Sequence, residues 1–242
     1  MRLPRFYEDQ PYTLGASITL SEEVVQHVCR ALRMRCNDQL ILFNQAGDEF
    51  IAELTQVDKR SAQVCLVEQL NNRTESPLHI HIGQSLSRGE RMDYAVQKST
   101  EMGVKAITPL FSERCEVKLP KDRQAKRVSH WQQIAISACE QSGRVQPPTI
   151  AMPLSLEEWV KAQDTDLKLV LHHHSRQPLA DMQAPLAVSL LIGPEGGLTN
   201  AEVELAQDYG FQPLTLGPRV MRTETAPVAA LTLMNYLWGD LH

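Results

Sequence analysis

The sequence predicts an α/β protein in two parts: a small β-barrel that carries one helix, and then a domain built on a parallel sheet. In residues 1–72, apolar and polar residues alternate along short runs separated by Gly-Asp turn chemistry, which is typical of antiparallel strands. From residue 73 onward, strand patterns alternate with helix patterns, which indicates a parallel sheet with helices on both faces. The polar stretch NNRTESP at residues 71–77 is a suitable linker. We therefore expect one domain at 1–72 and a second at 73–242.

One helix and three strands are expected in the first part. Ser21 is a good N-cap for the helix, which is expected to end near Arg33–Arg35. The apolar residues at helical spacing should form its buried stripe: Val24, Val25, Val28 and Leu32. The strands are QLILFN, FIAELTQVD and SAQVCLVEQL, at residues 39–44, 50–58 and 61–70.

Strands and helices alternate in the second part. A strand at 78–86 and a strand at 104–111 are separated by a helix that Gly103 ends. A long helix is expected from about Asp122 to Ser142, because its apolar residues recur at helical spacing. The remaining elements are a helix at 155–163, strands at 167–172 and 188–193, a helix at 200–210, a strand at 213–217 and a C-terminal helix.

Composition and charge restrict the function. The net charge of −5 argues against a nonspecific nucleic-acid binder, although basic residues do cluster, for example at 30–35 and 121–127. The five cysteines are widely spaced without a C-x-x-C pair, which disfavours a disulfide framework and a zinc cluster and fits a reducing compartment. No apolar stretch is long enough for a signal peptide or a membrane span. We expect a cytoplasmic protein with no membrane partner.

Three loops follow the carboxyl ends of predicted strands, where open α/β sheets bind ligands. They are the histidine run at 172–174, GPEGGLTNAE at 193–202 and LGPRVMRTETA at 216–226. Closely spaced glycines let a backbone bend sharply and approach a ligand, yet the pattern is neither G-x-G-x-x-G nor a phosphate loop. The histidine run is expected to form a wall of the site and not to bind metal, because consecutive residues of an extended chain point in alternate directions.

The two glycine- and arginine-containing loops carry a resemblance to a known family. IGPEGGLT followed by LGPRVMRTETA resembles the ribosomal RNA small subunit methyltransferase E family of the SPOUT superfamily. The segments at 76–104, 107–115 and 138–144 are similar to that family too, as is PRFY followed by HVCRALRMR. The resemblance covers essentially the whole chain.

The resemblance implies a fold, a cofactor and partners. It implies a PUA-like RNA-binding barrel, a SPOUT α/β domain with a deep trefoil knot, and a homodimer. It also implies S-adenosylmethionine as cofactor and methylation of N3 of a uridine in 16S ribosomal RNA, within the small ribosomal subunit. The implied cofactor-binding residues are Leu171, His172, Gly193, Pro194, Glu195, Gly196, Gly197, Leu216, Gly217, Val220, Met221, Glu224, Thr225 and Ala226.

The chemistry of uridine N3 suggests catalytic roles. The N3–H group is a weak acid, so the reaction needs a cation that stabilises the uracil anion and a carboxylate or water that takes the proton. Arg222 and Arg219 are the candidates for the cation, and Glu195 or Glu224 for the carboxylate. Both glutamates have a structural alternative, the capping of a helix or the fixing of a loop. Plausible RNA phosphate contacts are Arg5, Arg33 and Arg35.

Two other functions remain open from the sequence. With the same fold and cofactor, the chain could methylate a different target, such as transfer RNA or a ribose hydroxyl of RNA. A non-catalytic RNA-binding factor of ribosome assembly could also have this fold. Identification of the methylated nucleoside separates uridine-N3 methylation of 16S ribosomal RNA from methylation of a different RNA. Tight cofactor binding argues against the non-catalytic factor.

Overall fold

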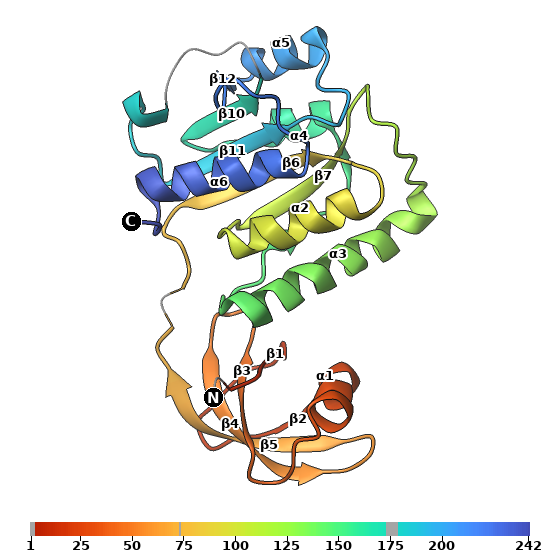
Figure 1. Cartoon of the computed structure of the whole chain (residues 1–242), viewed down its shortest axis with the longest axis vertical. Helices are drawn as coiled ribbons and strands as arrows, with labels where there is room; N and C mark the ends of the chain where they lie inside the picture. Colours follow the sequence, from red (N-terminus) through yellow and green to blue (C-terminus); the bar gives the residue numbers. More distant parts are fainter. Residues whose placement is uncertain (1–2, 73, 173–178) are drawn as a thin grey trace. The chain divides into compact units, whose positions relative to one another are not determined.

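The computed structural model of the chain describes residues 3–72, 74–172 and 179–242 (Figure 1). By their contacts the residues form two compact units. The first comprises Met1–Glu75 with Cys139–Pro147, and the second comprises Ser76–Ala138 with Pro148–His242. The grouping of 139–147 with the N-terminal residues has no signal in the sequence pattern. The division into domains at residues 72 and 73 stays a prediction.

A five-stranded sheet forms the first unit, with the strand order β1-β3-β4-β5-β2. β1 is parallel to β3, and the other neighbours are antiparallel. The strands expected from alternation are β3 (Gln39–Phe43), β4 (Glu49–Val57) and β5 (Ala62–Leu70). The sequence did not predict β1 (Arg5–Tyr7) and β2 (Ser17–Thr19), because three residues are too few to show an alternation.

The helix of the first unit is shorter than expected. Ser21 caps α1 (Glu22–Gln26) by accepting a hydrogen bond from the backbone N–H of Val24. The chain then continues as a π-helix, η1 (His27–Ala31), in which Leu32 N–H bonds to His27 O at 2.9 Å. This wider turn changes the direction of the following side chain, and Leu32 is 50% exposed. The expectation that Leu32 joins the buried stripe was wrong.

Seven strands of the second unit form one sheet, and every strand pair in it is parallel. The strand order is β12-β10-β11-β6-β7-β8, with β9 also paired to β7. The strands are β6 (His79–Ser85), β7 (Ala106–Phe111), β8 (Thr149–Ile150), β9 (Leu154–Ser155), β10 (Leu167–Leu171), β11 (Ala187–Ile192) and β12 (Gln212–Leu214). The helices are α2 (Glu90–Glu101), α3 (Lys121–Ser142), α4 (Leu156–Ala162), η2 (Leu179–Asp181), α5 (Asn200–Asp208) and α6 (Thr225–Trp238).

Helices cover both faces of the parallel sheet. On one face, α2 and α6 lie side by side over the strands (Figure 1), and α3 adds Trp131 to the same core. On the other face, α4 and α5 enclose a second core around Trp159 and Phe211. Close packing extends to the backbone, because a Cβ on Gly83 would lie 2.7 Å from the Trp159 ring. The predicted parallel sheet with two covered faces is therefore confirmed.

Local capping explains where the helices begin near the strand ends. Ser155 begins α4 and Thr199 begins α5, each through a capping box with the glutamate three residues later, Glu158 and Glu202. Among the described residues, no helix is long and apolar enough to cross a membrane. The trefoil knot stays a prediction.

Arg5 belongs to the interior of the first unit. Its side chain forms an ion pair with Glu49, and its Nη2 donates to the carbonyl oxygen of Arg144 at 3.0 Å. The guanidinium also lies over the Phe43 ring, 4.9 Å from the centroid, and the residue is 9% exposed. This burial contradicts the expectation that Arg5 contacts RNA. Arg33 and Arg35 are exposed, and their phosphate contacts stay predictions.

We expect Arg5→Ala to lower the free energy of unfolding by about 3 kcal/mol, because Glu49 would remain as an uncompensated buried charge. Urea unfolding of the full chain measures this change. The matched control is Arg35→Ala, an exposed arginine of the same unit, which should change the free energy of unfolding by less than about 0.5 kcal/mol. Equal effects of the two substitutions would contradict the structural role of Arg5.

Candidate functional site

A pocket of about 760 Å³ lies at the carboxyl ends of β10, β11 and β12, and contains the loops that follow these strands. Its volume is within the usual range for a small-molecule site. The end of β10 and the loops after β10 and β11 line it with Leu171, His172, Gly193, Pro194, Glu195, Gly196 and Gly197. The loop after β12 lines it with Leu216, Gly217, Arg219, Val220, Met221, Arg222, Glu224 and Ala226.

The loop after β11 needs glycine at several positions. A Cβ on Gly193 would lie 3.1 Å from the backbone nitrogen of Leu198, and Gly197 has a φ of +71°. Gly197 N–H closes a turn by bonding to Pro194 O at 2.9 Å. Arg114, after β7, donates from Nη1 to Gly196 O at 3.0 Å. The loop is therefore a tight turn that is held from a neighbouring strand end.

Hydrogen bonds join the loop after β12 to the other two. His172 N–H donates to Leu214 O at 2.9 Å, and the Thr215 hydroxyl donates to His172 O at 2.7 Å. Further along, the Thr223 hydroxyl donates to Gly193 O at 2.8 Å. The same hydroxyl accepts from Gln84 Nε2 at 3.1 Å, and Gln84 is only 1% exposed. Three strand ends are thereby tied into one wall.

Glu195 is committed to neighbouring groups on the α2 side of the pocket. Its Oε1 accepts from Arg91 Nη1 at 2.9 Å and from the backbone N–H of Arg88 at 3.2 Å. Desolvation raises the pKa of Glu195, but hydrogen bonds from its own backbone, Arg88 and Arg91, with the charge of Arg91, outweigh it and leave the pKa lowered. A carboxylate with a lowered pKa is a weaker base, so these contacts favour the loop-fixing role over proton removal.

Glu224 is in a different situation. It is the N-cap residue of α6, yet its side chain makes no capping hydrogen bond. Its Oε1 is 4.0 Å from Arg91 Nε, and its Oε2 is buried without a hydrogen-bond partner among the described residues. Because buried polar atoms are normally paired, this oxygen marks a place where a ligand group fits.

Two arginines of the site are exposed. Arg219 and Arg222 line the pocket, and neither has an ion-pair partner within the described part of the chain. Val220 between them is 80% exposed. With Arg91 and Arg114, the pocket has four arginines and two glutamates, an excess of positive charge that favours an anionic partner.

The structure brings together almost all of the residues expected at the site. Thr225 does not line the pocket; it is the exposed first residue of α6. The sequence reasoning missed Arg91, Arg114, Thr223 and Gln84. Arg91 and Arg114 follow the carboxyl ends of β6 and β7, so the strand-end rule, applied to all strands, would have indicated them.

Metal binding has no support in the described residues, which contain no group of three or more His, Cys, Asp or Glu side chains able to hold an ion. His173 and His174 of the histidine run lie outside the described residues. His81, which shares a strand face with His79, is half-buried and contacts Thr108 Oγ1 at 2.8 Å and Trp159 Nε1 at 3.3 Å. All five cysteines are described and free.

Comparison with protein families matches both parts of the chain. Residues 74–235 match the RNA methyltransferase domain model, and residues 20–66 match the RNA methyltransferase PUA domain model. The first match alone spans more than half of the chain. It includes all the residues that line the pocket.

Curated relatives agree over the whole length. The ribosomal RNA small subunit methyltransferase E of Buchnera aphidicola from Acyrthosiphon pisum is 36% identical over 241 residues, 99% of this chain and 95% of the relative. That of Bacillus subtilis is 34% identical, over 91% of this chain and 90% of the relative. The chain belongs to the ribosomal RNA small subunit methyltransferase E family.

Solved structures of similar proteins include members of the methyltransferase E family. The Neisseria gonorrhoeae ribosomal RNA small subunit methyltransferase E bound to S-adenosylmethionine is 40% identical, with a TM-score of 0.94 and full coverage of both chains. A Legionella pneumophila protein with the bound cofactor is 44% identical, with a TM-score of 0.96 and the same coverage. The expected fold, a PUA-like first part with a methyltransferase α/β second part, is confirmed.

We expect Glu195→Gln to loosen the loop after β11 while leaving global stability nearly unchanged. The pair with Arg91 is partly exposed, so its loss should cost no more than about 1 kcal/mol. Amide hydrogen exchange at residues 193–198 should accelerate by about fivefold, the factor that corresponds to that energy. Because the pKa of Glu195 is lowered, the carboxylate is charged at neutral pH, and the difference in exchange rate is present there. The exchange rate of wild type rises toward that of the variant only as pH falls below the ordinary carboxyl range.

The matched control is Glu157→Gln, which removes an equally short surface pair with Lys161, 2.7 Å apart on α4. Exchange at residues 193–198 should not change in this control. Equal exchange rates in wild type and Glu195→Gln would contradict the role of Glu195 as a loop clamp.

Proposed function

We propose that the protein transfers a methyl group from S-adenosylmethionine to N3 of a uridine in the 16S ribosomal RNA of the small subunit. The proposal is supported above all by one observation. In a chain of the methyltransferase E family, the loops after β10, β11 and β12 form one pocket that combines exposed arginines with a carboxylate oxygen that has no partner among the described residues.

The residues of the pocket fit the cofactor. Its walls include apolar side chains such as Leu171, Ile192 and Leu216, which suit an adenine ring. The glycine backbone at 193–197 allows a close approach, because at Gly193 even a methyl group would crowd the chain. Glu224 Oε2, buried without a partner in the described structure, has the charge that complements a sulfonium or ammonium group. When bound, S-adenosylmethionine supplies the electrophilic methyl group.

Catalysis then depends on positioning and on charge. The uridine loses its N3 proton, the N3 lone pair forms the new bond to carbon, and the carbon–sulfur bond breaks. Arg222 lies exposed at the pocket and stabilises the negative charge on the uracil before attack. Arg219 contacts the adjoining phosphate. The proton leaves to water, because Glu195 is already bound to Arg91 and Arg88.

RNA recognition involves the PUA part of the chain. The family model of an RNA methyltransferase PUA domain covers residues 20–66. Arg33 and Arg35 are exposed there and contact RNA phosphates, which orient the strand without reading its sequence. The net charge of −5 limits nonspecific binding, so the substrate is the folded RNA of a small ribosomal subunit. A uridine in that RNA is splayed out of its stack to reach the pocket.

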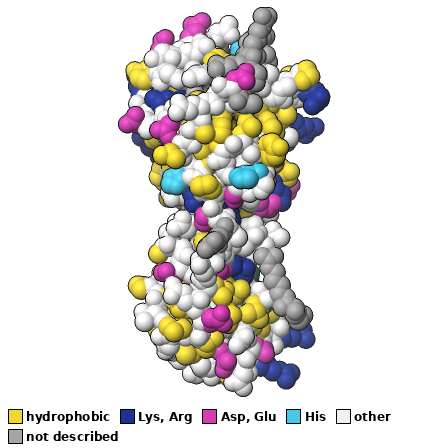
Figure 2. Space-filling view, turned by 90° about the vertical axis from the view of Figure 1, so that its left-hand side faces the viewer, with side chains coloured by type: hydrophobic (Ala, Val, Ile, Leu, Met, Phe, Trp, Pro, Cys, Tyr) yellow, Lys and Arg dark blue, Asp and Glu magenta, His cyan; other side chains and the backbone are white. Residues whose placement is uncertain are grey.

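The protein acts as a cytoplasmic homodimer in this proposal. Several large apolar side chains in the C-terminal half of α6 and just after it are exposed: Leu233, Tyr236, Leu237 and Leu241. Figure 2 shows hydrophobic side chains gathered on this side of the second unit. A second copy of the chain covers this surface, because exposed apolar patches mark protein contacts. Five free cysteines suit a reducing compartment.

The test uses small ribosomal subunits that lack the modification. They are incubated with the purified protein and methyl-labelled S-adenosylmethionine, and the digested RNA is analysed by mass spectrometry. Wild type should produce 3-methyluridine. Arg222→Ala should lower kcat by about 100-fold with the cofactor Kd unchanged, because Arg222 stabilises charge that develops only during reaction. Arg222→Lys keeps the charge and should retain more activity than Arg222→Ala.

Each other outcome would change the proposal. A different methylated nucleoside would keep the enzyme class and move the target. Cofactor binding with no methylated product from intact subunits would overturn the 16S assignment. Failure to bind the cofactor would support a non-catalytic assembly factor instead.

A further inference from the structure

A second, smaller pocket lies beside the N-terminal end of α2, with a volume of about 330 Å³. Its walls come from the loop after β6, the loop after β7 and the first turns of α3. They include Ser87, Arg88 and Gly89 from the loop after β6, and Leu119, Arg127 and Trp131 from the segment that leads into and through α3. No residue of the proposed methyl-transfer machinery lines this pocket.

The hydroxyl of Ser87 has no hydrogen-bond partner among the described residues. The residue is 5% exposed, and its Oγ is buried with no hydrogen bond to the described residues. Leaving such a group unpaired lowers stability, so a buried partnerless hydroxyl in a pocket wall indicates a ligand atom that pairs with it. The neighbouring groups show which kind of ligand this is.

Two arginines, Arg88 and Arg127, line the pocket together with Ser87, although α2 also has Glu90 and Asp93 in its first turn. Gly89 is the N-cap of α2 but offers no side-chain cap, so the positive end of the helix dipole faces its surroundings without one. Among the described residues, the Arg88 side chain forms an ion pair only with Glu116, and both side chains are about two-thirds exposed, which makes the pair weak and exchangeable. These features together fit a phosphate group.

Arg127 also lines the pocket, and its neighbours fix the orientation of its side chain. Its guanidinium lies 5.2 Å from the centre of the Trp131 ring, and Nη2 donates to Asp93 at 3.3 Å. Asp93 also contacts His130 and Trp131 Nε1, so its charge is shared among three neighbours. A guanidinium has five N–H donors, and the contact with Asp93 orients this group while using one of them.

The second pocket is adjacent to the cofactor pocket along the chain. Arg88 lines the second pocket, and its backbone N–H donates to Glu195 Oε1 at 3.2 Å. Arg91, three residues later, lines the cofactor pocket. A single RNA strand can supply both a base for the cofactor pocket and a backbone phosphate for the second pocket.

We propose that this pocket binds a backbone phosphate of the substrate RNA, at a nucleotide that flanks the target uridine. The inference rests on the proposed function and adds a second contact point for the strand. Ser87 and the N-terminus of α2 donate to the phosphate oxygens, and Arg88 and Arg127 neutralise the charge. The two contact points hold the splayed uridine over the cofactor pocket.

Ser87→Ala provides the most specific test, because it removes the hydroxyl and almost nothing else. Filter binding of unmodified small subunits should show about tenfold weaker RNA affinity, while the Kd for S-adenosylmethionine stays the same. The melting temperature should be unchanged or higher, since the folded protein loses an unpaired polar group. Ser142→Ala is the matched control: its Oγ is also buried and partnerless among the described residues, but it lines neither pocket.

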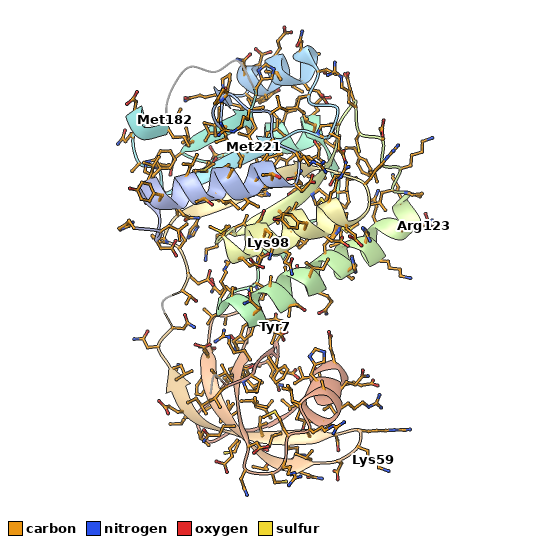
Figure 3. All side chains as sticks on the ribbon, in the orientation of Figure 1. Tyr7, Lys59, Lys98, Arg123, Met182 and Met221 are labelled. Atoms are coloured by element: carbon orange, nitrogen blue, oxygen red, sulfur yellow. The ribbon has the colours of Figure 1, made fainter. Side chains whose placement is uncertain are left out.

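Salt dependence tests the phosphate assignment. Arg88→Gln should reduce the slope of log K against log salt by about 0.7, the value for one phosphate contact on a single strand. The control is Arg123→Gln, an exposed arginine at the N-terminal end of α3 that lies outside both pockets (Figure 3), and its slope should match wild type.

Wild-type RNA affinity in Ser87→Ala, or an affinity loss accompanied by a lower melting temperature, would overturn the proposal. An unchanged salt slope in Arg88→Gln would do the same. If wild type binds subunits but transfers no methyl group, the proposed function fails, and these affinities still decide whether the pocket binds RNA.

Discussion

The site depends on one buried hydroxyl that joins the loops after β11 and β12 to strand β6. Thr223 donates to Gly193 O at 2.8 Å and accepts from Gln84 at 3.1 Å, and the threonine is only 6% exposed. Thr223 follows β12 in the chain, whereas Gly193 follows β11 and Gln84 lies in β6. Buried hydrogen bonds of this kind fix geometry, because breaking one leaves a polar atom unpaired. The pocket therefore has its shape before a ligand arrives, which reduces the ordering cost of binding.

Around this bridge, the charged side chains divide into two groups. Arg91 and Arg114 hold the glycine loop, the first through Glu195 and the second through Gly196 O. Arg219 and Arg222 lie exposed on the loop after β12. The first group maintains the pocket, and the second remains available for an anionic substrate. The backbone N–H groups of Thr225 and Ala226 both donate to Arg222 O at 3.0 Å, so the start of α6 fixes the backbone of the reactive arginine.

Sequence patterns predicted the fold well, because period and burial are local properties. The apolar runs at β10 and β11 indicated buried parallel strands, and the glycines at 193–197 indicated a close backbone approach. Contacts between distant residues left no such signal. Arg5 was misjudged because its burial depends on Glu49 and on the segment 139–147, which packs with the N-terminal residues only in three dimensions. The strand-end rule would have indicated Arg91 itself, but its pairing with Glu195, 104 residues away, left no local signal.

The most direct measurement is calorimetric titration of S-adenosylmethionine into wild type, Thr223→Val and Thr223→Ser. Valine keeps the shape of threonine but removes the hydroxyl that bridges Gly193 and Gln84. We expect about tenfold weaker binding in Thr223→Val, because the loops lose their common anchor and two buried groups lose a partner. Thr223→Ser keeps the hydroxyl and should bind within about twofold of wild type. Wild-type affinity in Thr223→Val would contradict the central role of this hydroxyl in shaping the pocket.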